Sequence, residues 1–188
     1  MPRPPATSYR RSVFVSYLRE LGRLGILGQV RDRVPGEVQS LIDDPLGADE
    51  FIDAGCFDHL LLAVGDLRGR DTVRAMGYQV MKNGFAEVLE PIIHFALYVS
   101  GGTPHALFSR AHIMAAIVSH GMKMEWHETG PRAGRMRLAA NAPVPAMAWA
   151  AWEGCGLYLL ELAGTGGYVD DAQVPPDGLS CEIAIRWK

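Results

Sequence analysis

The sequence predicts an α+β domain, in which an N-terminal helical half is followed by a ββαββ antiparallel sheet packed on helices. Three observations lead to this fold class. Residues 11–121 read as apolar helical segments separated by glycine and proline. Two runs of apolar–polar alternation follow, at 122–128 and 135–141. Two further strand segments, at 168–174 and 179–188, come after a long apolar helix. Alternating strands of this kind predict an antiparallel sheet with one covered face.

Composition fits one soluble globular domain. The chain has 188 residues, of which 48% are hydrophobic and 21% charged, enough to form one full core. The net charge of −3 gives no electrostatic reason to expect nucleic acid as a partner. The three cysteines, Cys56, Cys155 and Cys181, form no CxxC pair, so we expect free thiols in a reducing cytoplasm.

The N-terminus carries no targeting signal that the sequence reveals. Residues 1–10 are rich in proline and are predicted to form a disordered tail, with residues 11–188 as a single domain. The first residues lack the apolar core of a signal peptide. The most apolar stretch, Val144–Ala163, contains Glu153 and Glu161 and so is interrupted as a membrane span. We expect a cytoplasmic protein with no membrane span.

Glycines punctuate the helical half. The segment GRLGILG (22–28) lacks the GxGxxG spacing of a dinucleotide-binding loop, so turns between helices explain its glycines. His94 stands among apolar residues and is expected to be a core histidine. We expect helices at 13–24, 34–42, 57–67, 69–80, 84–89 and 92–100.

Thr103–Gly121 is predicted to form one helix that presents histidines outward. Thr103 suits the N-cap, the next residue is proline, and Gly121 supplies a stop. His105 and His112 fall on the face opposite the apolar stripe. They stand about 10 Å apart along the axis at 1.5 Å per residue, whereas zinc needs its nitrogens at about 2 Å. We therefore expect surface or interface histidines and no metal site.

The sheet half begins with a predicted hairpin. In the segment 122–128 the apolar residues, including Trp126, share one face, and Met136 and Leu138 do so in the segment 135–141. The helix Pro143–Ala163 comes next and is apolar on nearly all sides, so it should be buried on more than one. The closing strand 179–188 has the strongest alternation in the chain and follows a Pro-Pro-Asp-Gly turn.

Known catalytic motifs are missing from the sequence. It contains no GxSxG, GxxxxGK or HExxH, and its carboxylates show no catalytic pairing, so an enzyme is not the favoured reading. We instead predict a non-enzymatic binding or regulatory domain without a cofactor, which forms a dimer or docks on a protein partner. The apolar helix at 143–163 and the histidine face of 103–121 favour this reading. The expected interface residues are His105, His112, Ile113, Ala116, Trp149 and Leu160.

The alternative is a small-molecule sensor with a pocket between the helices and the sheet. Its ligand would be a small apolar molecule or haem. The residues expected to line this pocket are Phe95, Trp126, Trp152 and Cys155.

Several segments resemble known families. GYQVMKNGF (77–85), GMKMEWHE (121–128), EGCGLYLLELAG (153–164) and the final Trp187 resemble an uncharacterised family of similar length, expanded as paralogues in myxobacteria. The order of helices followed by ββαββ is also similar to TRAPP-type trafficking subunits, the 4-vinyl reductase small-molecule domain and haem–nitric oxide sensor domains. That similarity implies an acyl chain, a small ligand or haem held between helices and sheet.

The haem sensors make the most specific implication. Their proximal histidine lies on the helix before the first hairpin, so His105 or His112 would be the candidates here. Their Tyr-x-Ser-x-Arg clamp for the haem propionates lies near the second hairpin strand. This chain reads Arg135-Met-Arg-Leu-Ala there, without the tyrosine or the serine. Both histidines also fall on the face predicted to point away from the core.

Overall fold

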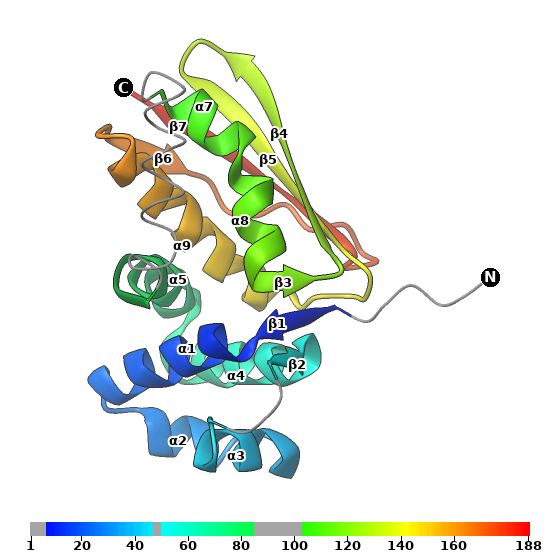
Figure 1. Ribbon diagram of the computed structural model, residues 1–188. Helices are drawn as coiled ribbons and strands as arrows, with labels where there is room; N and C mark the ends of the chain where they lie inside the picture. The colour runs from blue at the N-terminus through cyan, green and yellow to red at the C-terminus, as the bar shows by residue number, and fades with distance from the viewer. Residues whose placement is uncertain (1–6, 47–49, 85–102) are drawn as a thin grey trace, which may run out of the picture.

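The computed structural model describes residues 7–46, 50–84 and 103–188, and it confirms the α+β class. Its helical half lies below its sheet half in Figure 1. Two antiparallel sheets are present among the described residues. The small one has the strand order β2-β1-β3, which are Phe51–Asp53, Ser8–Arg10 and Ser119–His120. The larger one has the strand order β4-β5-β7-β6, which are Met122–Gly130, Ala133–Ala140, Ser180–Trp187 and Gly167–Val169.

The helical half buries apolar residues that recur at helical spacing. Leu18 and Leu21 of α1 and Val73 and Val80 of α5 are all buried for this reason. Its elements are β1 (Ser8–Arg10), α1 (Arg11–Arg23), α2 (Leu27–Arg31), α3 (Gly36–Asp43), β2 (Phe51–Asp53), α4 (Ala54–Arg68) and α5 (Arg70–Gly84).

The sheet half contains the predicted hairpin and closing strand. Trp126 of β4 lies opposite Met136 of β5, and β7 pairs with the other edge of β5. Its elements are α7 (Pro104–Ser109), α8 (Ala111–Val118), β3 (Ser119–His120), β4 (Met122–Gly130), β5 (Ala133–Ala140), α9 (Ala146–Leu162), β6 (Gly167–Val169) and β7 (Ser180–Trp187).

Helices cover one face of the larger sheet. Helices α7, α8 and α9 pack on that face, and α5 packs on the far side of α9, so α9 lies between the sheet and the helical half (Figure 1). Two glycines let α5 and α9 approach closely. A Cβ at Gly77 would collide with the backbone of Ala151, and a Cβ at Gly154 would collide with the backbone of Arg74. This seam joins the two halves of the protein.

Two local predictions are wrong. The segment expected as one helix, Thr103–Gly121, breaks at Arg110 into α7 and α8, and Ser119 is already extended. Ser119 is extended because β3 pairs with β1. At the break, the N–H of Arg110 bonds the carbonyl of Leu107 at 3.1 Å and the N–H of Ile113 bonds the carbonyl of Arg110 at 2.9 Å, three residues back in each case. Residues 8–10, which were predicted to belong to a disordered tail, instead form β1 between β2 and β3, and Tyr9 is buried; residues 1–6 lie outside the described residues.

Candidate functional site

Two apolar cavities lie between the helical half and the sheet. The sheet-side cavity has a volume of about 40 Å³ and is bordered by residues of α5, α8, α9, β4 and β5. The helix-side cavity has a volume of about 60 Å³ and is bordered by residues of β1, α1, α4, α5, α8 and α9. Four residues border both cavities, and they are Met81, Val118, Trp152 and Cys155. The two spaces therefore flank one shared partition.

Methionine dominates the sheet-side cavity. Met81, Met114, Met124 and Met136 reach it from four different elements. They account for half of the eight methionines in the chain. The small residues Ala111, Ala115 and Gly156 leave the space that these thioethers surround. Methionine is flexible and polarisable, which suits a wall that adapts to different shapes.

Cys155 contributes a thiol to the partition. Its sulfur lies 3.9 Å from the carbonyl oxygen of Gly77, where the S–H can donate. Burial raises the pKa of this thiol to about 12, so it stays neutral near pH 7. The partition therefore presents neutral sulfur and the indole of Trp152 to both cavities.

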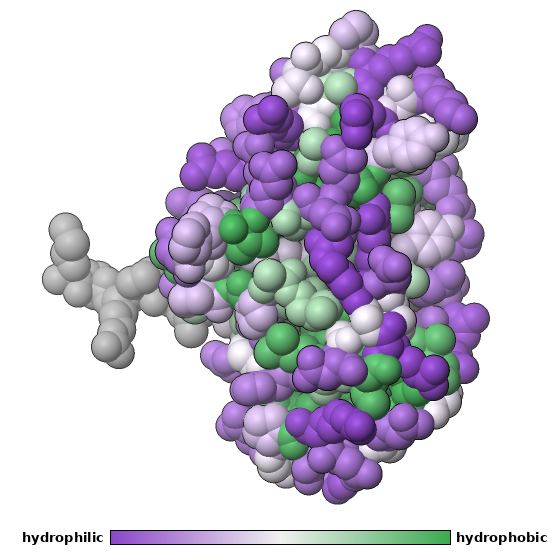
Figure 2. All heavy atoms as spheres, turned by 180° about the vertical axis from the view of Figure 1, so that it is seen from behind, coloured by the Kyte–Doolittle hydropathy of each residue, from purple (hydrophilic) through white to green (hydrophobic). Residues whose placement is uncertain are grey.

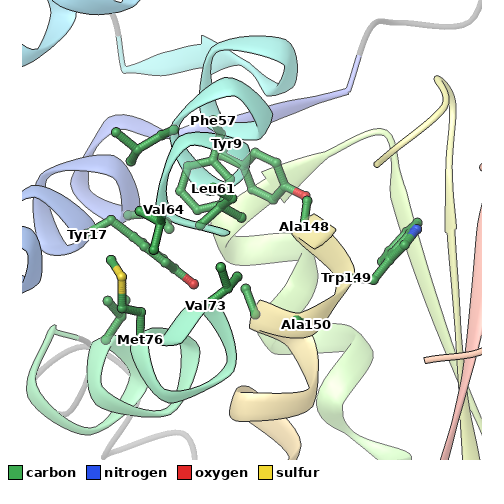
Figure 3. Close-up of a cluster of buried hydrophobic side chains, with 14 of the residues drawn as sticks. Tyr9, Tyr17, Phe57, Leu61, Val64, Val73, Met76, Ala148, Trp149 and Ala150 are labelled. Carbon is green, nitrogen blue, oxygen red and sulfur yellow. The ribbon is translucent and has the colours of Figure 1, made fainter. Parts of the chain in front are cut away.

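Two buried tyrosines border the helix-side cavity. Their rings both pack on Phe57, with centroid distances of 4.9 Å for Tyr9 and 4.7 Å for Tyr17. Figure 3 shows that the ring of Tyr9 extends toward α9 and that the ring of Tyr17 reaches from α1 into the same core. The indole N–H of Trp152 donates a hydrogen bond to the hydroxyl oxygen of Tyr9. Within the described residues, the hydroxyl of Tyr17 has no hydrogen-bond partner.

Burial keeps both phenols protonated. It raises the pKa of Tyr9 above its ordinary value, and the charge of Asp58 adds to that rise. Burial likewise raises the pKa of Tyr17 well above 10. Each hydroxyl therefore remains a hydrogen-bond donor at any pH at which the protein functions.

A buried ion-pair network fixes how α9 is turned. Glu153 is fully buried on α9, and the Arg70 guanidinium donates to both of its oxygens, at 2.9 Å for Oε2. The backbone N–H of Ala172 donates to Oε1 at 2.6 Å. Arg74 donates to the carbonyl oxygen of Val169 and lies 3.8 Å from Glu153. These contacts tie α5, α9 and the segment after β6 together, which holds Trp152 and Cys155 toward the cavities.

An open groove at the other end of α9 is larger than either cavity, but the polar side chains on its border are already engaged. It has a volume of about 580 Å³ and is bordered by α5, the end of α9 and residues 164–167. Its polar side chains already pair with one another. Lys82 donates to Glu161 at 2.8 Å, and the hydroxyl of Tyr78 also donates to Glu161. Glu161 and Tyr78, two of the polar side chains that border the groove, are therefore already engaged.

The predicted pocket residues divide between two places. Trp152 and Cys155 border both cavities, as the sensor reading expected of them. Trp126 lies elsewhere, stacked on Phe108 at 4.7 Å and near Trp187 at 6.4 Å, because α7 covers that end of the sheet. Phe95 lies outside the described residues. The sequence reading missed Tyr9, Tyr17 and the four methionines.

The predicted interface residues also divide. His112, Ile113 and Ala116 are exposed on α8. Trp149 and Leu160 are instead buried within the monomer, because strands β6 and β7 cover the second apolar side of α9. Their assignment to an outer interface is corrected on that ground.

His105 is likewise not an outward residue. Its Nε2 lies 3.1 Å from the carbonyl oxygen of Gly130, and its ring packs edge-on against Trp187 at 4.7 Å. The helix α7 therefore lays this ring under the tip of the β4–β5 hairpin instead of presenting it to a partner.

The described residues contain no candidate metal-binding cluster. Within residues 7–46, 50–84 and 103–188, no three His, Cys, Asp or Glu side chains are placed to hold a metal ion together.

Solved structures with a similar fold are H-NOX domains. An Fe(II) unliganded H-NOX protein from K. algicida gives a TM-score of 0.70 at 10% identity, covering 95% of this chain and 96% of that chain. A structure described as probing heme distortion in the H-NOX family gives 0.59 at 15% identity, with 95% of each chain covered. An oxygen-binding H-NOX domain related to soluble guanylate cyclases gives 0.55 at 15% identity, again with 95% of each chain covered. The sequence matches no family model and no curated protein.

These similarities decide between the resemblances that the sequence suggested. The haem–nitric oxide sensors were one of three similar folds, and the structural neighbours are of that kind. The resemblance to myxobacterial paralogues gains no support. The prediction of a domain without a cofactor is overturned, because the neighbours are described as Fe(II) or heme proteins. At such low identity the similarity extends to the fold alone, and the chain has the fold of the H-NOX domains.

Proposed function

We propose that this chain is a ligand-sensing domain whose ligand occupies the space between the helical half and the sheet half. The observation that carries the proposal is the pair of apolar cavities on either side of Trp152 and Cys155. Ligand sites are typically concave, mostly apolar and equipped with few polar groups, and this space has those properties. The ligand that the cavities favour is a small apolar molecule.

Because the structural neighbours are H-NOX domains, haem has to be tested as a ligand of this space. A haem iron takes an axial ligand from the protein, such as a histidine, cysteinate or tyrosine side chain. His105 lies under the hairpin tip, and His112 is exposed with its Nδ1 2.9 Å from the carbonyl oxygen of Ser109. None of the other described histidines borders either cavity. His94 lies outside the described residues.

The described residues of β5 also provide no clamp for the propionates of a haem. Arg135 stands in the segment where the sensors carry their clamp, but it points to the outer face of the sheet and donates to Glu182 at 2.9 Å. The described residues therefore do not fit a haem held by histidine and clamped from β5. Our proposal rests on the apolar cavities and not on that group.

Docking on a protein partner receives less support than ligand sensing. The exposed large apolar side chains come from separate segments, such as Leu46 in the turn after α3 and Tyr168 on β6. From behind, hydrophilic residues cover most of the surface, and apolar residues appear in small groups between them (Figure 2). Among the described residues, the structure contains no helix with the length and apolar character needed to cross a bilayer. A protein partner and a cytoplasmic location stay predictions.

Native mass spectrometry with a cavity-filling variant tests the proposal. Ala115 borders the sheet-side cavity, whereas its neighbour Ala116 on α8 is exposed. Ala115→Leu fills the cavity, and Ala116→Leu is the matched control. We expect gently purified wild type and Ala116→Leu to carry a bound small molecule that Ala115→Leu lacks. Equal ligand content in all three proteins, or a wild type that binds no apolar molecule, would contradict the proposal.

A further inference from the structure

The hydroxyl of Tyr17 belongs to a ring at the wall of the helix-side cavity, and no hydrogen bond from it is found among the described residues. Tyr17 is only 3% exposed and borders the helix-side cavity. Within the described residues nothing accepts its hydrogen bond. Buried polar groups are almost always paired, because leaving one unpaired is unfavourable. An unpaired hydroxyl at a cavity wall therefore points to an acceptor that arrives with the ligand.

Tyr9 borders the same space and packs on the same Phe57 ring, but its hydroxyl oxygen accepts a hydrogen bond from the indole N–H of Trp152. An indole N–H only donates, so this bond engages the oxygen of Tyr9 and not its O–H proton. The two tyrosines therefore differ at the oxygen, which is engaged in Tyr9 and has no partner among the described residues in Tyr17. The variants Tyr9→Phe and Tyr17→Phe decide which of the two hydroxyls donates to a ligand.

The rest of the wall restricts what the ligand can be. Among the described residues, no charged side chain borders either cavity. A charged ligand would be left without a counter-ion there, which is strongly unfavourable. The ligand is therefore uncharged and largely apolar.

The cavities must also enlarge when they are filled. Each is smaller than the roughly 150 Å³ of an apolar cavity known to admit benzene. Met81 borders both cavities and is the one unbranched, flexible side chain among the four residues that they share. The unbranched thioether side chains around it can move without a loss of packing that branched residues would suffer.

We propose that the ligand is an uncharged molecule with an apolar body and one hydrogen-bond acceptor, such as a ketone carbonyl, and that the hydroxyl of Tyr17 donates to this acceptor. This inference rests on the proposed function, since it names the class of ligand for the same space. Tyr17 acts here as a specificity-determining residue.

A matched pair of probes tests it. Acetophenone and ethylbenzene have similar shapes, and only acetophenone carries an acceptor. Calorimetric titration should show that wild type prefers acetophenone by roughly 2- to 12-fold, the contribution of one hydrogen bond. In Tyr17→Phe the preference should disappear while ethylbenzene still binds. Tyr9→Phe, the control, should keep at least the wild-type preference, because it frees the indole N–H of Trp152 and leaves Tyr17 intact.

The two ways of failing are distinguishable. If wild type and Tyr17→Phe bind the probes with the same ratio of dissociation constants, the role of Tyr17 is refuted and the ligand space stands. If wild type binds neither probe, both this inference and the proposed function fail. Loss of folding does not confuse the result, since the phenyl ring of the Tyr17→Phe variant keeps the contact with Phe57 and gives up no hydrogen bond made among the described residues.

Discussion

Removing Arg70 should destabilise the protein more than removing its partner. In Arg70→Met the carboxylate of Glu153 stays behind, fully buried, with only the N–H of Ala172 and the distant Arg74 to support it. Breaking a buried pair so that a charge is left costs about 3–5 kcal/mol, and we expect about 4 kcal/mol here. Glu153→Gln leaves cations that are 29% and 22% exposed and can reach water, so about 2 kcal/mol is expected.

Urea denaturation monitored by circular dichroism measures both values, provided that the slope of unfolding free energy with urea is unchanged. Arg186→Gln is the control. Its pair with Asp170 is exposed, at 61% and 44%, and such pairs contribute at most about 1 kcal/mol. The reasoning is refuted if Arg70→Met costs no more than Arg186→Gln.

Three further outcomes are expected. Gly154→Ala should destabilise by about 1–3 kcal/mol in thermal denaturation, because its Cβ meets the backbone of α5, whereas Gly28→Ala, with open space around it, should not. Asp58 has a pKa raised to about 7 by burial and by Asp53, above its unfolded value of 3.8. The free energy of unfolding should therefore fall as pH rises from about 4 to 7. Asp58→Asn should flatten this dependence on pH and raise the free energy of unfolding by on the order of 2 kcal/mol at pH 8. The same pH dependence in wild type and variant would show that the carboxyl titrates normally. After haem loading, His112→Ala should leave the absorption spectrum of the protein unchanged, because the imidazole faces solvent; a shifted Soret band would place it on the iron.

The sequence predicted the sheet half well because its signals are local. Alternation along 122–128 and 135–141 placed Trp126 and Met136 inward, and the two lie opposite each other in the hairpin. The helix that became α9 was predicted to be buried on more than one side, and it lies between the sheet and α5. In both cases the period of the pattern and the final environment agree.

The missed features depend on contacts between distant segments. Tyr9 was assigned to a tail, because a three-residue strand gives no periodic signal and its partners, β2 and β3, lie far along the chain. The end of α8 at Val118 follows from the same pairing, because Ser119 and His120 join β1. Alternation could place Met124 and Met136 on the inner face, but their meeting with Met81 and Met114 depends on how α5 and α8 pack.

Expected site residues failed for a related reason. The apolar character of Trp126, Trp149 and Leu160 was read correctly, but the sequence could not say which neighbour covers each one. Trp126 is covered by α7, and Leu160 lies against Gly167 of β6. An apolar residue indicates burial, and only the tertiary arrangement tells a core position from a ligand pocket or an interface.

A crystal structure of the protein with acetophenone tests the central claim most directly. The account predicts electron density for the probe between Met81, Trp152 and Cys155, with its carbonyl oxygen within hydrogen-bond distance of the Tyr17 hydroxyl. Density found only in the open groove beside Tyr78, with both apolar cavities closed and unchanged, would contradict it.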